Sequence, residues 1–149
     1  MFRITEDNQV LTTLESRAIL VGIALNNEEV EASMDELESL AEADGVTVLG
    51  RMVQQLPRPN GGTLIGSGKV IELAELCKNM EADTVIFNEE LNGIQLRNLE
   101  DALDVRVLDR TILILDIFAS RAVSREGKLQ VELAQLRYRL PRLLGFGKS

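Results

Sequence analysis

The feature that most restricts the fold of this chain is an alternation of short apolar runs with segments of helical period. The first run, Ala18–Leu25 (AILVGIAL), contains no polar residue, which is typical of a strand covered on both faces. Asn26 and Asn27 favour the start of a helix, which we expect to continue to about Asp44 before Gly45 ends it. Apolar residues recur along that helix at spacings of four, three and four, at Val30, Met34, Leu37 and Ala41.

The strand-then-helix order repeats as far as residue 109. Helical stripes separate three further predicted strands, at 46–54, 84–87 and 105–108. Asn92 and Gln95 have the spacing of a capping pair at the start of one of these helices. Such strands pair in parallel through right-handed crossovers, so the predicted fold is α/β, an open parallel sheet of about four strands with helices on both faces. We expect this domain at 18–110, preceded by an arm at 1–17.

The segment 111–149 differs and is predicted to be a long amphipathic helical extension. Its first half, 112–122, is apolar on more than one side and is compatible with a helix or a strand, and Gly127 indicates a hinge or a helix junction. Beyond it, five leucines alternate at spacings of four and three, the pattern of a coiled-coil seam: Leu129, Leu133, Leu136, Leu140 and Leu143. This leucine seam either packs back onto the α/β domain or pairs elsewhere. Because no second long helix follows, we expect the first part of a helical hairpin that is cut short.

Charge divides the chain at the same place. The whole sequence carries a net charge of −8, but residues 1–109 hold 8 Lys/Arg and 21 Asp/Glu, whereas residues 110–149 hold 8 Lys/Arg and 3 Asp/Glu. The basic part can approach nucleic acid because Lys and Arg near phosphates release counterions, although a basic helix can also be simply solvated. With four Phe, one Tyr and no Trp, base stacking is a poor candidate mechanism.

The stretch GGTLIGSGKV (61–70) resembles a phosphate-binding loop but lacks two of its defining residues. Counting back from Lys69 places Thr63 at the position of the first glycine, and Val70 stands where a magnesium-binding hydroxyl is required. We therefore expect a turn with Ser67 as a helix N-cap. The alternative is a nucleotide site at the start of that helix, made by Gly66, Ser67, Gly68 and Lys69.

Other catalytic and metal-binding arrangements are disfavoured. The chain has no His and one cysteine, Cys77, which argues against zinc ligation and nucleophilic triads, and no metal ligand set is apparent. A phosphoreceiver site is disfavoured because Asn88 follows the third strand in place of Asp. Glu89 and Glu90 are interpreted as an exposed helix entry. No stretch matches a membrane span or a signal peptide, so a cytoplasmic protein is expected.

Three long stretches of the chain have a distinctive wording: LIGSGKVIELAEL (64–76), VIFNEELNGIQLRNLE (85–100) and VLDRTILILDIFASRAVSREGKLQVELAQLRYRLPRL (107–143). In this order they resemble the amino-terminal part of HflX-type GTPases. The resemblance implies an α/β domain, then a helical hairpin, then a GTPase domain that lies beyond Ser149. GTP and magnesium would bind in that missing domain, so we expect neither a cofactor nor GTP hydrolysis in this chain.

The resemblance also implies partners. HflX-type GTPases bind the large ribosomal subunit and split or rescue stalled ribosomes, which makes this chain a candidate ribosome- and rRNA-binding module. Six basic residues are the expected contacts to rRNA phosphates: Arg121, Arg125, Lys128, Arg137, Arg139 and Arg142. The leucine seam is an alternative functional surface, for the GTPase domain of the same parent chain or for self-association. ATP binding by the amino-terminal domain has been proposed in the family and would assign that role to the loop at 66–69.

Overall fold

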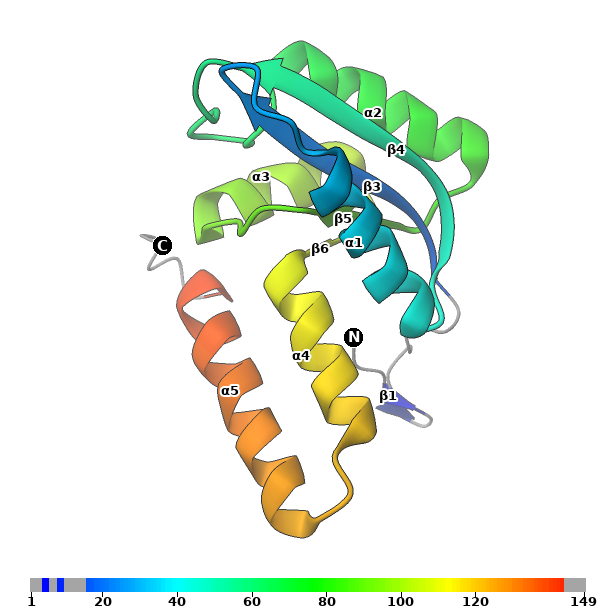
Figure 1. Ribbon diagram of the computed structural model, residues 1–149, viewed down its shortest axis with the longest axis vertical. Helices are drawn as coiled ribbons and strands as arrows, with labels where there is room; N and C mark the ends of the chain where they lie inside the picture. Colours follow the sequence, from blue (N-terminus) through cyan, green and yellow to red (C-terminus); the bar gives the residue numbers. More distant parts are fainter. Residues whose placement is uncertain (1–3, 6–7, 10–15, 144–149) are drawn as a thin grey trace.

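The computed structural model describes residues 4–5, 8–9 and 16–143 of the chain (Figure 1). Its first two strands, β1 (Ile4–Thr5) and β2 (Asn8–Gln9), form a short antiparallel pair. The predicted arm 1–17 otherwise lies largely outside the described residues. The remaining elements, in chain order, are β3 (Arg17–Leu25), α1 (Glu31–Ala43), β4 (Thr47–Leu56), α2 (Ser67–Met80), β5 (Thr84–Phe87), α3 (Gly93–Leu103), β6 (Arg106–Asp109), α4 (Arg110–Arg121) and α5 (Arg125–Leu143).

The main sheet is open and parallel, with strand order β4-β3-β5-β6. β3 lies inside the sheet between β4 and β5, and every residue from Ala18 to Ala24 is buried. This confirms the α/β class and the four parallel strands expected from the alternation of apolar runs and helices. Because the strands are parallel, their carboxyl ends meet at one edge, where open α/β folds form their ligand sites.

Helices cover both faces of this sheet (Figure 1). On one face, α2 and α3 contribute Leu73 and Leu99 to a core that includes Phe87 of β5. On the other face, α1 and α4 contribute Leu37 and Leu113 to a second core. The sheet residues alternate between the two cores because successive side chains of a strand point to opposite faces. Within the described ranges, every helix falls short of the length and apolar character that crossing a bilayer requires.

Two predicted helix starts are displaced. Asn26 and Asn27 do not cap α1 but take left-handed backbone conformations, with φ of 51° and 65°, in the turn after β3. Asn tolerates this conformation better than most residues, so a turn forms there and α1 begins only at Glu31. Ser67 is the first residue of α2, and the N-cap is Gly66, whose N–H donates to Gln54 Oε1 at 2.9 Å.

The stretch 112–122, compatible from sequence with a helix or a strand, is helical as far as Arg121 and belongs to α4. Asp109, the last residue of β6, caps this helix by accepting a hydrogen bond from the N–H of Ile112 at 3.0 Å. The cap turns the chain directly from the sheet into α4, so that Ile112, Leu113 and Ile117 pack against the sheet.

Helix α5 runs alongside α4, and together the two helices extend away from the sheet (Figure 1). Their junction is Ala122–Ser124, and Gly127 lies inside the first turn of α5, where its N–H donates to Ser124 Oγ at 2.9 Å. The leucine seam is not buried in the fold, since its residues are 48–69% exposed, although Leu143 lines a pocket with Val107 and Leu108 of β6. Residues 144–149 of the predicted extension lie outside the described part of the chain.

Candidate nucleic-acid interface

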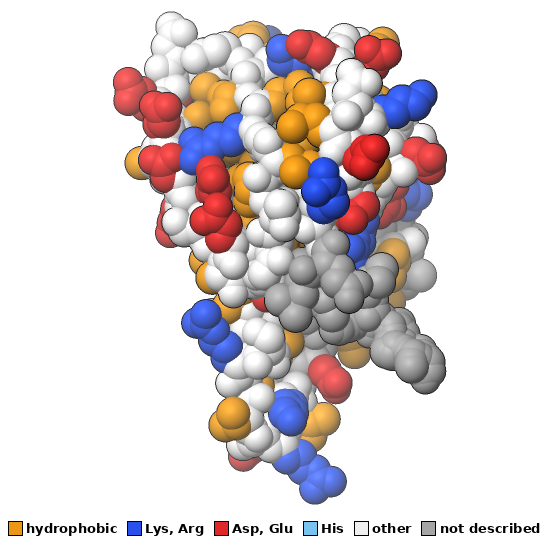
Figure 2. Space-filling model, turned by 90° about the vertical axis from the view of Figure 1, so that its right-hand side faces the viewer, with side chains coloured by type: hydrophobic (Ala, Val, Ile, Leu, Met, Phe, Trp, Pro, Cys, Tyr) orange, Lys and Arg blue, Asp and Glu red, His pale blue; other side chains and the backbone are white. Residues whose placement is uncertain are grey.

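Four of the six predicted RNA contacts are exposed on the α4–α5 pair. Arg121 ends α4, and Arg125, Lys128 and Arg137 lie on α5. On the face shown in Figure 2, the α/β part carries many acidic side chains with basic ones among them, whereas basic and apolar side chains predominate at the narrow end of the molecule. The fold therefore converts the charge division of the sequence into a division in space.

The remaining two candidates, Arg139 and Arg142, are partly buried. Burial lowers the pKa of the Arg139 guanidinium, although nearby Asp116 favours its charged form. The side chain of Arg142 is 12% exposed, and its Nε donates to the carbonyl oxygen of Leu91 at 2.9 Å. The structure thus places these two arginines against the α/β part instead of with the exposed group.

A buried carboxylate that the sequence did not single out joins α5 to the sheet. Asp109 accepts hydrogen bonds from the N–H of Leu91 at 2.9 Å, from the N–H of Ile112, and from the hydroxyl of Tyr138 on α5. Burial raises the pKa of Asp109, while the Tyr138 hydrogen bond opposes the increase. A position at the end of a strand, directly before an apolar helix, was the one available sequence signal for this role.

The loop at 66–69 has its polar groups partly engaged within the fold. Lys69 Nζ forms an ion pair with Glu72 Oε1 at 3.2 Å, one turn along α2. The backbone N–H of Gly66 is taken by Gln54, while a side chain at Gly68 would meet nothing within 4 Å. The first turn of α2 is thus a regular helix start, and none of these contacts points to a nucleotide.

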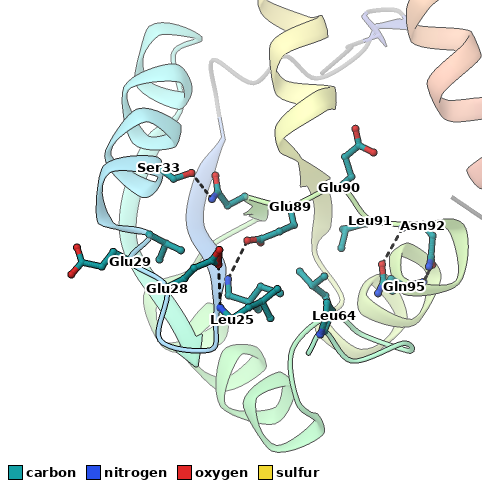
Figure 3. A pocket seen from close by; sticks show the side chains of 14 residues that line it. Leu25, Glu28, Glu29, Ser33, Leu64, Glu89, Glu90, Leu91, Asn92 and Gln95 are labelled. Atoms are coloured by element: carbon teal, nitrogen blue, oxygen red, sulfur yellow. Dashed lines mark hydrogen bonds between the residues drawn. The ribbon is translucent and has the colours of Figure 1, made fainter. Parts of the chain in front are cut away.

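A pocket of about 600 Å³ opens at the carboxyl edge between β3 and β5 (Figure 3). Glu89 was interpreted as part of an exposed helix entry, but its carboxyl group turns inward, and Oε2 accepts from the N–H of Ile23 at 3.4 Å. Burial raises the pKa of Glu89 to about 7, and the Glu28 carboxylate adds to the increase. Because Glu29 and Glu90 also line it, this pocket disfavours an anionic ligand such as phosphate.

Metal binding finds no support at this edge. In the described ranges, no group of three His, Cys, Asp or Glu side chains could hold an ion. On the α4–α5 pair, the exposed side chains of Arg121, Arg125, Lys128 and Arg137 offer ionic contacts.

Family models for GTPase segments match the α/β part from α1 onward and the extension. The model described as "GTP-binding GTPase N-terminal" matches residues 31–119, and "GTP-binding GTPase Middle Region" matches residues 121–149. The chain belongs to this GTPase family. The boundary between the two matches falls at the end of α4.

Relatives within the family specify it as the HflX type. "GTPase HflX" of Alkalihalophilus pseudofirmus is 56% identical over 87% of this chain, and that of Caldanaerobacter subterraneus is 53% identical over 89%. "GTPase HflX" of Escherichia coli is 44% identical over 86%. These matches confirm the resemblance found in the sequence. The chain spans only 30–31% of the length of these relatives.

Solved structures with the same arrangement are also GTP-binding proteins. A GTP-binding protein from Sulfolobus solfataricus in complex with GDP has a TM-score of 0.65 and 27% sequence identity, covering 88% of this chain and 39% of that chain. The SsGBP–GDP complex gives a TM-score of 0.69 at 27% identity, covering 87% of this chain and 37% of that one. The likeness supports the α/β architecture with its helical extension.

Proposed function

We propose that this chain is the ribosome- and rRNA-binding amino-terminal module of an HflX-type GTPase that associates with the large ribosomal subunit in the cytoplasm and splits or rescues stalled ribosomes. The observation that carries the proposal is the separation of charge between an acidic α/β part and a projecting α4–α5 pair. The exposed basic side chains of that pair supply the contacts to phosphate: Arg121, Arg125, Lys128 and Arg137.

The binding is electrostatic in character. Guanidinium and ammonium groups form charge-assisted hydrogen bonds with phosphate oxygens, which position a protein on RNA without reading its bases. The acidic helix α1 and the glutamates of the carboxyl-edge pocket repel phosphate, so the α4–α5 pair approaches RNA first. The module is thereby oriented as well as attracted.

Co-sedimentation with purified large ribosomal subunits at low and moderate salt tests this proposal. The triple variant Arg125→Ala, Lys128→Ala and Arg137→Ala should bind more weakly, and the slope of log K against log salt should flatten by roughly 0.7–0.9 for each phosphate that the protein no longer neutralises. The matched control removes three exposed basic residues from the α/β part, Arg58→Ala, Lys78→Ala and Arg97→Ala. Equal losses of affinity in both variants would refute a specific role for α5.

GTP hydrolysis is proposed for the parent protein and not for this segment. The relatives are named GTPases, and this chain covers about a third of their length. GTP and Mg²⁺ would bind in a separate GTPase domain, which is also the expected intramolecular partner of this module. We expect no phosphate release when the present chain is incubated with GTP and Mg²⁺.

The exposed leucine seam favours a second, compatible function as an interaction surface. An apolar stripe of this length on one helix marks a surface that packs against another element, in the rest of the parent protein or in a second copy. Analytical ultracentrifugation should show self-association of the present chain at high concentration. The variant Leu133→Lys, Leu136→Lys should be monomeric, and persistent dimers would exclude the seam as their cause.

A further inference from the structure

Arg142 is engaged by several groups at once. Beyond its bond to the carbonyl of Leu91, its Nη1 donates to the carbonyl of Tyr138 at 2.7 Å, and its guanidinium lies 3.6 Å from the centre of the Tyr138 ring. Glu90 Oε1 lies 3.9 Å from Nη2. With these donors committed within the fold and only 12% of the side chain exposed, little of the guanidinium is accessible to a phosphate.

Tyr138 extends the same attachment to the sheet. Its hydroxyl donates to Asp109, the carboxylate that also accepts from Leu91 and caps α4. Asp109 is 2% exposed, so loss of the Tyr138 hydroxyl would leave part of its hydrogen-bonding capacity unsatisfied in the interior. The contact therefore resists replacement by water.

Gly93 allows α5 to approach this closely. It is the first residue of α3, and a Cβ at this position would lie 2.9 Å from the carbonyl oxygen of Arg142. The obstacle is backbone on both sides, so a larger residue would require α5 to shift as a unit. The attachment thus uses main-chain shape as well as side-chain bonds.

We propose that Arg142 is a positioning residue and not a phosphate contact. Together with Tyr138, Asp109 and Gly93 it forms a clamp that fixes the carboxyl-terminal half of α5 on the Glu90–Gly93 segment. Gln135, the buried residue of α5, donates to Asp116 of α4 at 3.4 Å, and the clamp adds the attachment to the sheet edge that directs the exposed basic side chains. The effect of the clamp on RNA contacts rests on the proposed function. The claim that the clamp fixes α5 on the α/β part does not depend on RNA binding.

A distance measurement tests the structural claim without RNA. Spin labels on cysteines introduced at Ser39 of α1 and Leu140 of α5, both exposed, report the position of α5 in the 149-residue chain with Cys77 replaced by Ala. We expect one narrow distance distribution in the doubly labelled 149-residue chain without a clamp substitution. The distribution should be clearly broader in Arg142→Gln and in Tyr138→Phe. Arg137→Gln, which makes the same change of charge on the exposed side of α5, should keep the narrow distribution. An unchanged distribution in both clamp variants would overturn the clamp.

Salt titration of large-subunit binding separates positioning from contact. Tyr138→Phe and Arg142→Gln should weaken binding by about three- to tenfold, because a loosened helix loses conformational entropy when it binds. Neither variant should change the slope of log K against log salt. Arg137→Gln should flatten the slope. A flattened slope in Arg142→Gln would make Arg142 a phosphate contact and overturn the inference. If the unmutated 149-residue chain binds no large ribosomal subunits, the proposed function fails. The distance measurement then tests the clamp by itself.

Discussion

Helices α4 and α5 lie side by side and carry apolar residues at similar spacings, yet only α4 buries them. Leu113 of α4 is fully buried, whereas the leucine seam of α5 is 48–69% exposed and the buried residue of that helix is Gln135. The difference shows that an apolar stripe in the sequence predicts that a helix will pack, but does not predict the surface against which it packs. In α4 the direct connection to β6 decides the orientation, and in α5 the polar contacts of Tyr138 and Arg142 decide it.

The largest effect should come from truncating one leucine in each helix. Leu113→Ala should lower the free energy of unfolding by about 2–5 kcal/mol, because it removes buried atoms and leaves a cavity in the core. Leu133→Ala should change it by less than about 0.5 kcal/mol in the monomer. Urea denaturation of both variants measures the contrast, and a large loss of stability in Leu133→Ala would mean that the seam is covered in solution.

A smaller difference is expected between the caps of the two helices. Asp109→Asn should lower the free energy of unfolding by about 2–3 kcal/mol, because an amide cannot accept all three hydrogen bonds of the buried carboxylate. Ser124→Ala, which removes the exposed cap of α5, should lower it by about 0.5–1 kcal/mol. Equal losses of stability in thermal denaturation would contradict the view that α5 is attached mainly by its far end.

A half-buried carboxyl group of the α/β part, Glu89, should make the stability of the protein depend on pH. The pKa of Glu89 is raised from 4.5 to about 7 by burial, so the native state binds this proton more tightly than the unfolded state does. The stability that Glu89 contributes is therefore present below pH 4.5 and is lost as the pH rises through 7. At pH 8 the free energy of unfolding of Glu89→Gln should exceed that of the unmutated chain by about 1–2 kcal/mol, an amount reduced for partial solvent screening. At pH 4.5 the two should be equally stable.

The matched control for this measurement is Glu132→Gln, on the exposed side of α5. Its difference from the unmutated chain should be small in chemical denaturation at pH 8. If the Glu89→Gln difference did not change between pH 4.5 and pH 8, the carboxyl group of Glu89 would not titrate in the native state as described.

The sequence predicted the elements best where one local rule decides them. The strand Thr84–Phe87 and the capping pair Asn92–Gln95 are present as predicted, because a short apolar run and a cap are set by neighbouring residues. The start of α1 was missed because Asn26 and Asn27 suit a left-handed turn as well as a cap, and only the exit of β3 selects between them.

The candidate site was less predictable, because its contacts join distant parts of the chain. The sequence assigned Arg142 to the same basic group as Arg137, and nothing local separates them. Only the approach of α5 to Leu91 and Gly93 shows that the Arg142 side chain is hydrogen-bonded within the fold. The inward turn of Glu89 likewise depends on Ile23, a residue of another strand. Which of the basic residues contact RNA stays a prediction.

The strand order also bears on how the sheet forms. The central strand β3 pairs with β5, with Ala18 opposite Thr84, across a much longer segment of chain than the one that separates β5 from β6. Closing so long a segment slows folding, whereas single helices form in about a microsecond or less. The anchors of α5, Leu91 and Asp109, are brought together by the pairing of β5 with β6, so α5 can dock only where both strands are already in place.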